Sequence, residues 1–302
     1  MWGRRAAGRT SLVPHAAIAT ATTVDGTRIA HRTEGAGPPL LLLGGQSNSH
    51  RWWDPVRADF AAARTTISLD YRGTGGSDKP DRPYSTQEFA EDAVAVLDAL
   101  GVGRADVYGT SMGGRVAQWL AARHPERVRA LVLGCTSPGG AHAIERAPEV
   151  RRSLAAADPR AARAALLALM YTPGWLAVHR GPFTTIGDPA MPPYARGRHL
   201  VASNKHDAWD VLPSIAAPTL VLHGDDDLLN PTANAPLLAG RIPGARLELI
   251  PGARHAYFEE FSAVATPMVL DFLGSSDADP RGDRPTRADA FPGRVPPEAL
   301  GP

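Results

Sequence analysis

One serine of this chain, Ser111, lies in a pattern that could make its hydroxyl a nucleophile. The segment 106–116 reads DVYGTSMGGRV, with Gly109 two residues before the serine and Gly113 two residues after it. Small neighbours at this spacing allow a sharp strand-to-helix turn with the serine at its apex, where bulky residues would clash. The helix expected to begin there would also direct its first free N–H groups toward a developing negative charge. Ser111 is therefore the candidate nucleophile.

A serine hydroxyl is a weak nucleophile near neutral pH, so the chain must also supply a base and an acid that orients it. His255, in IPGARHAYFEEF, follows the last predicted strand and could take the serine proton and return it to the leaving group. The segment HGDDDLLNP offers three acids directly after a strand: Asp225, Asp226 and Asp227. The residues alone leave the choice among them open. His223, inside the preceding strand run, is expected to have a structural role.

An acyl-transfer site also needs donors for the oxyanion, commonly two backbone N–H groups. The N–H of Met112, directly after the candidate nucleophile, is one candidate. The second should come from the loop after PLLLLG, at Gly45 or Gln46, where glycine allows the backbone to approach a substrate closely. The alternative interpretation of these glycines is an ordinary strand-to-helix turn.

The apolar pattern predicts elements that would bring these residues together. Helical patterns separate six unbroken apolar runs, which are typical of parallel strands covered on both faces. The runs are 39–44, 65–70, 105–109, 129–134, 217–224 and 245–252. The clearest helix begins after Ser85, which opens an S-x-x-E capping box, and a hairpin is expected around Asp25-Gly26. We predict an α/β fold with a doubly wound, mostly parallel sheet, whose ligand groups gather at the carboxyl ends of the strands.

The segment 137–208 departs from this alternation, because it is rich in Ala, Arg and Pro and has helical patterns without a strand-like run. We interpret it as a helical insertion between the two parts of the core, 18–136 and 209–274. Residues 1–17 are interpreted as a flexible N-terminal arm. Residues 275–302, rich in Pro, Asp and Arg, are interpreted as a disordered tail that cannot bury enough apolar surface to fold.

The composition excludes several classes of function. The chain has 302 residues, 43% hydrophobic and 21% charged, with a formal net charge of +1, so neither nucleic acid nor a membrane surface is an expected partner. Its single cysteine, Cys135, excludes an internal disulfide; we interpret it as a buried structural thiol, with a catalytic cysteine as the alternative. No His/Cys/carboxylate cluster has metal-ligand spacing, so we expect neither a metal nor a cofactor. A cytoplasmic monomer or homodimer with a small-molecule substrate is the expectation.

Five segments together resemble the α/β-hydrolase superfamily, in particular its esterase, enol-lactonase and haloperoxidase-like branch. They are LLLLGGQS, LDYRGTGGSD, GTSMGGRVA, PTLVLHGDDDLLNP and IPGARHAYFEEF, spread over about residues 20 to 273. The family pattern H-G-x-x-D-x-x-x-P matches His223, Gly224, Asp227 and Pro231, so the resemblance implies Asp227 as the acid of a Ser-His-Asp triad. This chain departs from the family at Gly44-Gly45, where His-Gly is usual.

The resemblance also implies that the insertion forms a cap over the pocket and that the activity is hydrolysis of a carboxylic ester or lactone. The candidate substrate-binding residues are Trp52, Trp53, Trp175, Met191, Tyr194 and Trp209. Their character favours a largely apolar substrate. The alternatives are hydrolysis of a C–C bond in a diketone, peracid formation by a cofactor-free haloperoxidase-like enzyme with the same triad, and a non-catalytic ligand receptor of this fold.

Overall fold

The computed structural model describes residues 18–277, which form an eight-stranded sheet in the order β1-β2-β4-β3-β5-β6-β7-β8. The strands are β1 (Ala19–Thr22), β2 (Arg28–Glu34), β3 (Pro39–Leu43), β4 (Thr65–Leu69), β5 (Ala105–Thr110), β6 (Val128–Gly134), β7 (Thr219–Gly224) and β8 (Arg246–Ile250). The ladders β1·β2 and β2·β4 are antiparallel, and the other five are parallel. The predicted fold class is confirmed.

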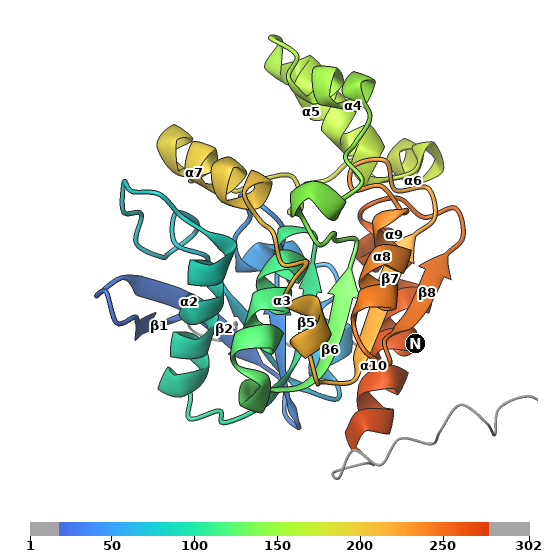
Figure 1. Ribbon diagram of the computed structural model, residues 1–302. Coiled ribbons are helices and arrows are strands. Elements are labelled where there is room, and N and C mark those ends of the chain that lie inside the picture. Colours follow the sequence, from blue (N-terminus) through green and yellow to red (C-terminus); the bar gives the residue numbers. More distant parts are fainter. Residues whose placement is uncertain (1–17, 278–302) are drawn as a thin grey trace, which may run out of the picture.

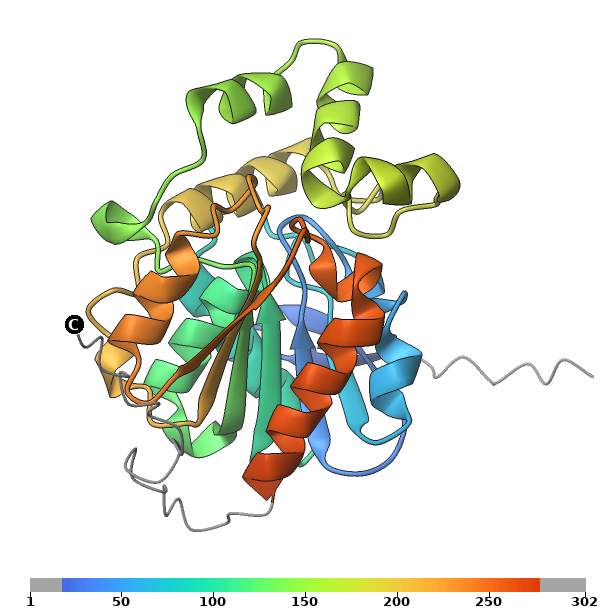
Figure 2. The same ribbon diagram turned by 90° about the vertical axis from the view of Figure 1, so that its right-hand side faces the viewer.

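Helices cover both faces of this sheet, as Figures 1 and 2 show. The core helices are α1 (Arg57–Ala61), α2 (Thr86–Ala99), α3 (Met112–Arg123), α8 (Asn234–Arg241), α9 (Tyr257–Glu260) and α10 (Ser262–Asp277). Short 3-10 turns add η1 (His50–Trp53), η2 (Pro125–Arg127) and η4 (Leu212–Ser214). Helices α2, α3 and α8 pack on one face, while α1 and α10 pack on the other. Among residues 18–277, no helix combines the length and the apolar character that a bilayer crossing requires.

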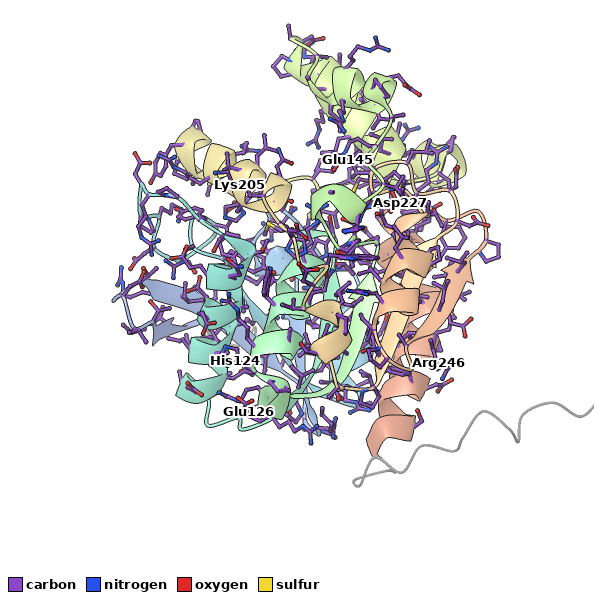
Figure 3. The ribbon with its side chains drawn as sticks, in the orientation of Figure 1. His124, Glu126, Glu145, Lys205, Asp227 and Arg246 are labelled. Atoms are coloured by element: carbon purple, nitrogen blue, oxygen red, sulfur yellow. The ribbon has the colours of Figure 1, made fainter. Side chains whose placement is uncertain are left out.

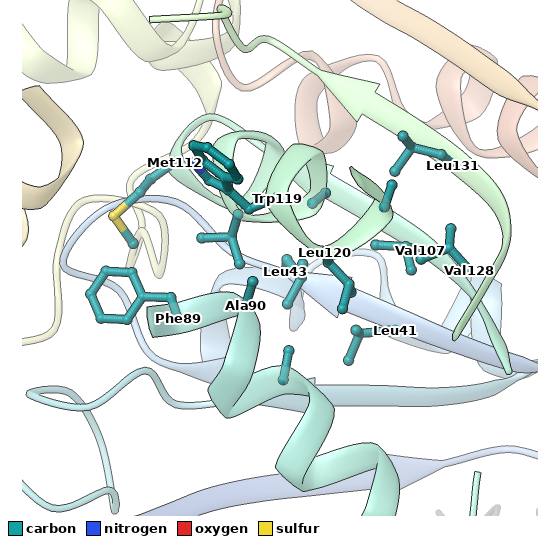
Figure 4. Close-up of a cluster of buried hydrophobic side chains, with 14 of the residues drawn as sticks. Leu41, Leu43, Phe89, Ala90, Val107, Met112, Trp119, Leu120, Val128 and Leu131 are labelled. Carbon is teal, nitrogen blue, oxygen red and sulfur yellow. The ribbon is translucent and has the colours of Figure 1, made fainter. Parts of the chain in front are cut away.

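The two faces explain why the strands read as unbroken apolar runs. In β3, Leu41 and Leu43 point toward α2 and α3, in the cluster that Figure 4 shows. The alternate residues Leu40 and Leu42 belong to the opposite cluster with Phe60 of α1. Because successive strand residues face opposite sides, a strand covered on both faces needs apolar side chains at every position.

Local signals set the element ends. The hydroxyl of Ser85 accepts a hydrogen bond from the Glu88 N–H at 3.1 Å, so α2 begins where the capping box predicted. Gly26 takes φ 81° in the hairpin between β1 and β2. At the other end of the chain, α10 continues past Gly274 to Asp277, into the range predicted as a tail. The predicted N-terminal arm and the rest of the predicted tail lie outside the described residues.

A second group of helices lies above the carboxyl ends of the parallel strands (Figures 1 and 2). It comprises η3 (Gly140–His142), α4 (Pro148–Leu154), α5 (Pro159–Met170), α6 (Pro173–Val178) and α7 (Pro193–Asn204). The two ends of this segment meet, because Ala208 N–H donates to the Pro138 carbonyl at 2.9 Å and Gly139 bridges to Asp207. We call residues 137–208 the cap segment.

Candidate active site

Ser111 is the single residue that connects β5 to α3, and its backbone there has φ 56° and ψ −123°. This positive φ is costly for a residue with a side chain and persists only where the surroundings hold it. Here the Ser111 N–H donates to the Gly134 carbonyl at 2.9 Å, and the Ser111 carbonyl accepts from Thr136 Oγ1 at 2.8 Å. The backbone is therefore fixed on both sides of the candidate nucleophile.

The glycines around Ser111 are required by close backbone approach. A Cβ at Gly109 would lie 2.3 Å from the carbonyl oxygen of Gly113. A Cβ at Gly113 would lie 2.0 Å from the carbonyl oxygen of Leu43 at the end of β3. Both distances are shorter than any ordinary carbon–oxygen contact, so the turn excludes larger residues at these two positions.

The imidazole of His255 contacts the carboxylate of Asp227, with 2.7 Å between Nδ1 and Oδ2. Both side chains are buried. This bond occupies Nδ1 and leaves Nε2 to exchange a proton. Ser111 and His255 line the same cavity. The described residues include no hydrogen bond between Ser111 Oγ and His255, a contact that catalytic pairs often tighten only when substrate binds.

Asp227 is held as an anion by four hydrogen bonds. Its Oδ1 accepts from the N–H groups of Leu229 and Asn230, both at 2.9 Å, and its Oδ2 accepts from His255 and from His223 Nε2, the latter at 3.1 Å. Burial alone would raise the pKa of Asp227, but the charge of His255 and the bonds from both imidazoles lower that pKa below its ordinary value. Asp227 can therefore stabilise a positive charge on His255.

The two neighbouring aspartates have other partners. Asp225 Oδ1 accepts from the Gly252 N–H at 2.6 Å, and Asp226 pairs with Arg254 at 3.0 Å. Of the three acids that the residues alone left open, Asp227 is the one whose carboxylate contacts His255.

His223 takes a larger part in the site than its strand position indicated. Its Nε2 lies 3.1 Å from Asp227 Oδ2 and 2.9 Å from the Asn230 carbonyl oxygen, so it donates to the acid that holds His255. The signal was present in the sequence, because the pattern H-G-x-x-D contains both His223 and Asp227.

The loop after β3 supplies the second face of the site. Gln46 and Met112 both line the cavity, and within residues 18–277 the backbone N–H of neither has a hydrogen-bond acceptor. Gly45 is not part of the cavity lining. Its role is steric, since a Cβ there would lie 2.5 Å from the Trp52 ring.

The cap segment holds this loop in place through contacts that no sequence signal marked. Ser47, with φ 60°, donates its N–H to His199 Nδ1 at 3.3 Å, and its carbonyl accepts from the Asp188 N–H at 2.7 Å. His199 Nε2 in turn donates to the Arg72 carbonyl at 2.8 Å. Burial lowers the pKa of His199 to about 4, so the ring is neutral and can accept and donate at once.

The cavity itself measures about 1200 Å³ and is lined by residues that follow the strands and by residues of the cap segment. Figure 3 shows Asp227 at the upper edge of the core and Glu145 in the segment above it. Apolar side chains line part of the cavity: Trp52, Leu154, Leu166, Met170, Leu200 and Leu229. Charged side chains line another part: Arg115, Glu145, Arg146, Arg151 and Arg196. The lining is thus more polar than the predicted apolar substrate would require.

Of the six predicted substrate-binding residues, the structure brings Trp52 to this cavity. Its ring stacks on Phe258 with centroids 5.1 Å apart, and its Nε1 donates to Thr110 Oγ1 at 2.9 Å. The other five side chains lie elsewhere. Trp53 packs on Tyr108 inside the core, Met191 belongs to the cluster around α2, Trp175 lines a separate cavity of about 250 Å³, Tyr194 donates to the Lys79 carbonyl, and Trp209 stacks on His142. Residue type alone does not distinguish an aromatic that packs the core from one that lines a pocket.

Among the described residues, no group of three His, Cys, Asp or Glu side chains is arranged to hold a metal ion. Cys135 is buried at the end of β6 with φ 37°, and its carbonyl accepts from Asn230 Nδ2. Burial raises the pKa of its thiol well above the ordinary value, so the thiol is protonated at neutral pH.

Comparison with known proteins places the chain in a family. A family model described as "alpha/beta hydrolase fold" matches residues 38–262. The "Putative carbamate hydrolase RutD" of Azorhizobium caulinodans is 33% identical over 255 residues, which are 82% of this chain and 95% of that protein. The 2-hydroxymuconate semialdehyde hydrolase of Pseudomonas putida is 32% identical over 269 residues, which are 84% of this chain and 93% of that protein.

Solved structures agree with this result. The enol-lactonase from Burkholderia xenovorans LB400 superposes on this chain with a TM-score of 0.72 at 27% identity. The superposition covers 85% of this chain and 100% of the enol-lactonase chain. Since the family model spans most of the core that carries Ser111, Asp227 and His255, the chain belongs to the α/β-hydrolase family.

Proposed function

We propose that this protein is a serine hydrolase that cleaves a carboxylic ester or lactone through an acyl-enzyme. The observation that carries the proposal is the buried Asp227–His255 pair, 2.7 Å apart, beside the same cavity as the strained Ser111. A nucleophile at a fixed turn, a base with one ring nitrogen engaged by a carboxylate, and free N–H donors are the parts that acyl transfer needs.

In the first half of the proposed reaction, His255 Nε2 takes the proton of Ser111 as Oγ attacks the substrate carbonyl. The negative oxygen of the tetrahedral intermediate accepts hydrogen bonds from the N–H groups of Met112 and Gln46, which have no acceptor within the described part of the chain. The imidazolium then gives its proton to the leaving alkoxide, and an ester between the acyl group and Ser111 remains.

In the second half, His255 removes a proton from water, and the hydroxide attacks the acyl carbon. Collapse of the second tetrahedral intermediate returns the proton to Ser111 and releases the acid. In a lactone, the alcohol formed in the first half stays attached to the acyl group, so the product is a hydroxy acid. Asp227 stabilises the imidazolium in both halves.

The test is Ser111→Ala, compared with the unaltered protein on a panel of p-nitrophenyl esters and lactones. We expect kcat to fall by about 10⁴- to 10⁶-fold because the nucleophile is lost. A fluorophosphonate probe should label Ser111 in the unaltered protein and leave the variant unlabelled. Turnover that survives in the variant would show that the nucleophile is another residue. Probe labelling without turnover of any ester or lactone would favour the receptor alternative.

Hydrolysis of a C–C bond is a second candidate, favoured by the similarity to the 2-hydroxymuconate semialdehyde hydrolase. The same panel should therefore include a diketone whose C–C bond such a reaction would cleave. A kcat/KM for that diketone higher than for every ester and lactone would favour the second candidate. The reverse order would favour the first.

A further inference from the structure

The cavity beside Ser111 carries an excess of positive charge. Four arginines line it, Arg115, Arg146, Arg151 and Arg196, against one lining carboxylate, Glu145. Glu145 forms an ion pair with Arg151 at 2.9 Å. Within residues 18–277, neither Arg115 nor Arg146 has a carboxylate at ion-pair distance.

Arg115 lies one helical turn after the candidate nucleophile. Its backbone N–H donates to the Ser111 carbonyl at 3.3 Å, so its side chain leaves the same end of α3. The guanidinium, which is partly buried, bonds only to neutral groups: Nη1 to the carbonyl and hydroxyl of Ser203, at 2.6 and 2.9 Å, and Nη2 to Ser137 Oγ at 2.9 Å. A guanidinium has five N–H donors, and two of them remain here without an acceptor in the described part of the chain.

Arg146 adds a second positive charge to the lining of the same cavity. Its guanidinium makes no hydrogen bond within the described residues, although the side chain is partly buried. Burial and, after it, the positive charge of Arg146 lower the pKa of Arg115 to about 10, against the attraction of Glu145. Burial also lowers the pKa of Arg146, against the attraction of Glu145 and of Asp227. Arg115 and Arg146 therefore place two positive charges in the lining of the cavity that also holds Ser111 and His255.

Two cations without a carboxylate at ion-pair distance are unfavourable in the lining of one partly buried cavity, and an anion bound between them removes the cost. Guanidinium groups match the planar geometry of a carboxylate. We propose that Arg115 and Arg146 bind a carboxylate of the substrate, so that the preferred substrate is an ester or lactone that carries a second, free carboxylate. This inference rests on the proposed function only for the reacting group, the ester or lactone. The site for the carboxylate is inferred from the residues that line the cavity.

The test uses two esters with the same acyl chain and leaving group, one with a free carboxylate and one with that carboxylate methylated: mono-p-nitrophenyl adipate and methyl p-nitrophenyl adipate. In the unaltered protein, we expect the anionic ester to have the higher kcat/KM. In Arg146→Gln, the ratio of the two kcat/KM values should fall by about 10- to 100-fold, which is the usual effect of losing a charge-assisted bond. The loss should be in KM, since the carboxylate is bound equally before and during the chemical step.

Two variants control this measurement. Arg246→Gln removes the same charge from an exposed position on β8, where the side chain pairs with Glu248, and should leave the ratio unchanged. Arg146→Lys keeps the charge without the planar fork and should restore part of the ratio. An equal ratio in the unaltered protein and Arg146→Gln, or an equal fall in Arg246→Gln, would overturn the inference.

A binding measurement separates this inference from the proposed function. Titration calorimetry on Ser111→Ala with monomethyl adipate and dimethyl adipate measures anion binding without any turnover. Tighter binding of the monoanion, weakened by adding Arg146→Gln, supports the subsite even if no ester is hydrolysed. Equal binding of the two adipates refutes the subsite even if the protein is an active esterase.

Discussion

The substitution Asp227→Asn replaces one carboxylate oxygen by an amide NH2 group, and the hydrogen bonds of Asp227 predict which of the two oxygens is replaced. Oδ1 of Asp227 accepts two backbone N–H bonds, from Leu229 and Asn230, while Oδ2 faces His255 Nδ1 and His223 Nε2. An asparagine amide oxygen must stay on the Oδ1 side, because an amide NH2 there would meet two donors. The NH2 group of the variant therefore points at both histidines.

This orientation reverses the hydrogen bond to His255. Because His255 Nδ1 now faces an N–H donor, it must become the acceptor, and the ring proton moves to Nε2. Nε2 is the nitrogen that has to accept the proton of Ser111, so the base is in the wrong tautomer. The equivalent change of acid to amide in a serine protease lowers kcat about 10⁴-fold through the same wrong tautomer. We expect kcat/KM to fall about 10⁴-fold, which corresponds to about 5 kcal/mol of transition-state stabilisation.

The variant should also be less stable, because His223 Nε2 cannot turn away from the amide. That nitrogen also donates to the Asn230 carbonyl at 2.9 Å and must keep its proton. Two buried donors face each other, at a cost of about 1 to 3 kcal/mol in the free energy of unfolding. Urea denaturation measures this cost, and kcat/KM for a p-nitrophenyl ester between pH 6 and 9 measures the first effect.

Asp226→Asn is the matched control. The Asp226 carboxylate is 47% exposed and pairs with Arg254, and an exposed pair of this kind contributes at most about 1 kcal/mol. We expect its kcat/KM to stay within about threefold of the unaltered protein. The reasoning would be refuted if Asp227→Asn kept kcat/KM within tenfold, or if Asp226→Asn lost as much.

Two further predictions concern folding. Gly113→Ala places a Cβ 2.0 Å from the Leu43 carbonyl oxygen and should lower the free energy of unfolding, measured in urea, by about 2 kcal/mol or more. Gly240→Ala, in α8 with open space at the Cβ position, is the control and should be neutral or slightly stabilising. Equal effects of the two substitutions would contradict the close approach at Gly113. His199 has a pKa of about 4 in the folded chain and about 6.5 when unfolded, so its contribution is intact above pH 6.5 and is lost, by on the order of 3 kcal/mol, as the pH falls to 4. His199→Gln should flatten the decline of stability between pH 6.5 and 4, measured by urea denaturation, and an unchanged slope would show that other groups cause it.

Much of the fold could be predicted from the sequence because its signals are local. The six strands β3 to β8 lie on the six predicted apolar runs, and α2 begins directly after Ser85, whose hydroxyl caps it. The turn at Ser111 depends on Gly109 and Gly113, two residues away on either side, so the motif carries its own geometric reason. Periodicity and turn chemistry need only neighbours in the chain, and a single sequence records those neighbours completely.

The composition of the cavity was decided by the tertiary structure. Trp53 and Met191 pack in the core, while Arg115 and Arg146 face the cavity from segments that lie far apart in the chain. His199 reaches across 152 positions to hold Ser47, a contact that its own neighbours do not foreshadow. Which side of a cap helix faces the substrate depends on how the helix docks, and that is a property of packing between distant segments. The sequence by itself thus determined the sheet and the candidate nucleophile, base and acid, while packing decided what kind of molecule the cavity around them can hold.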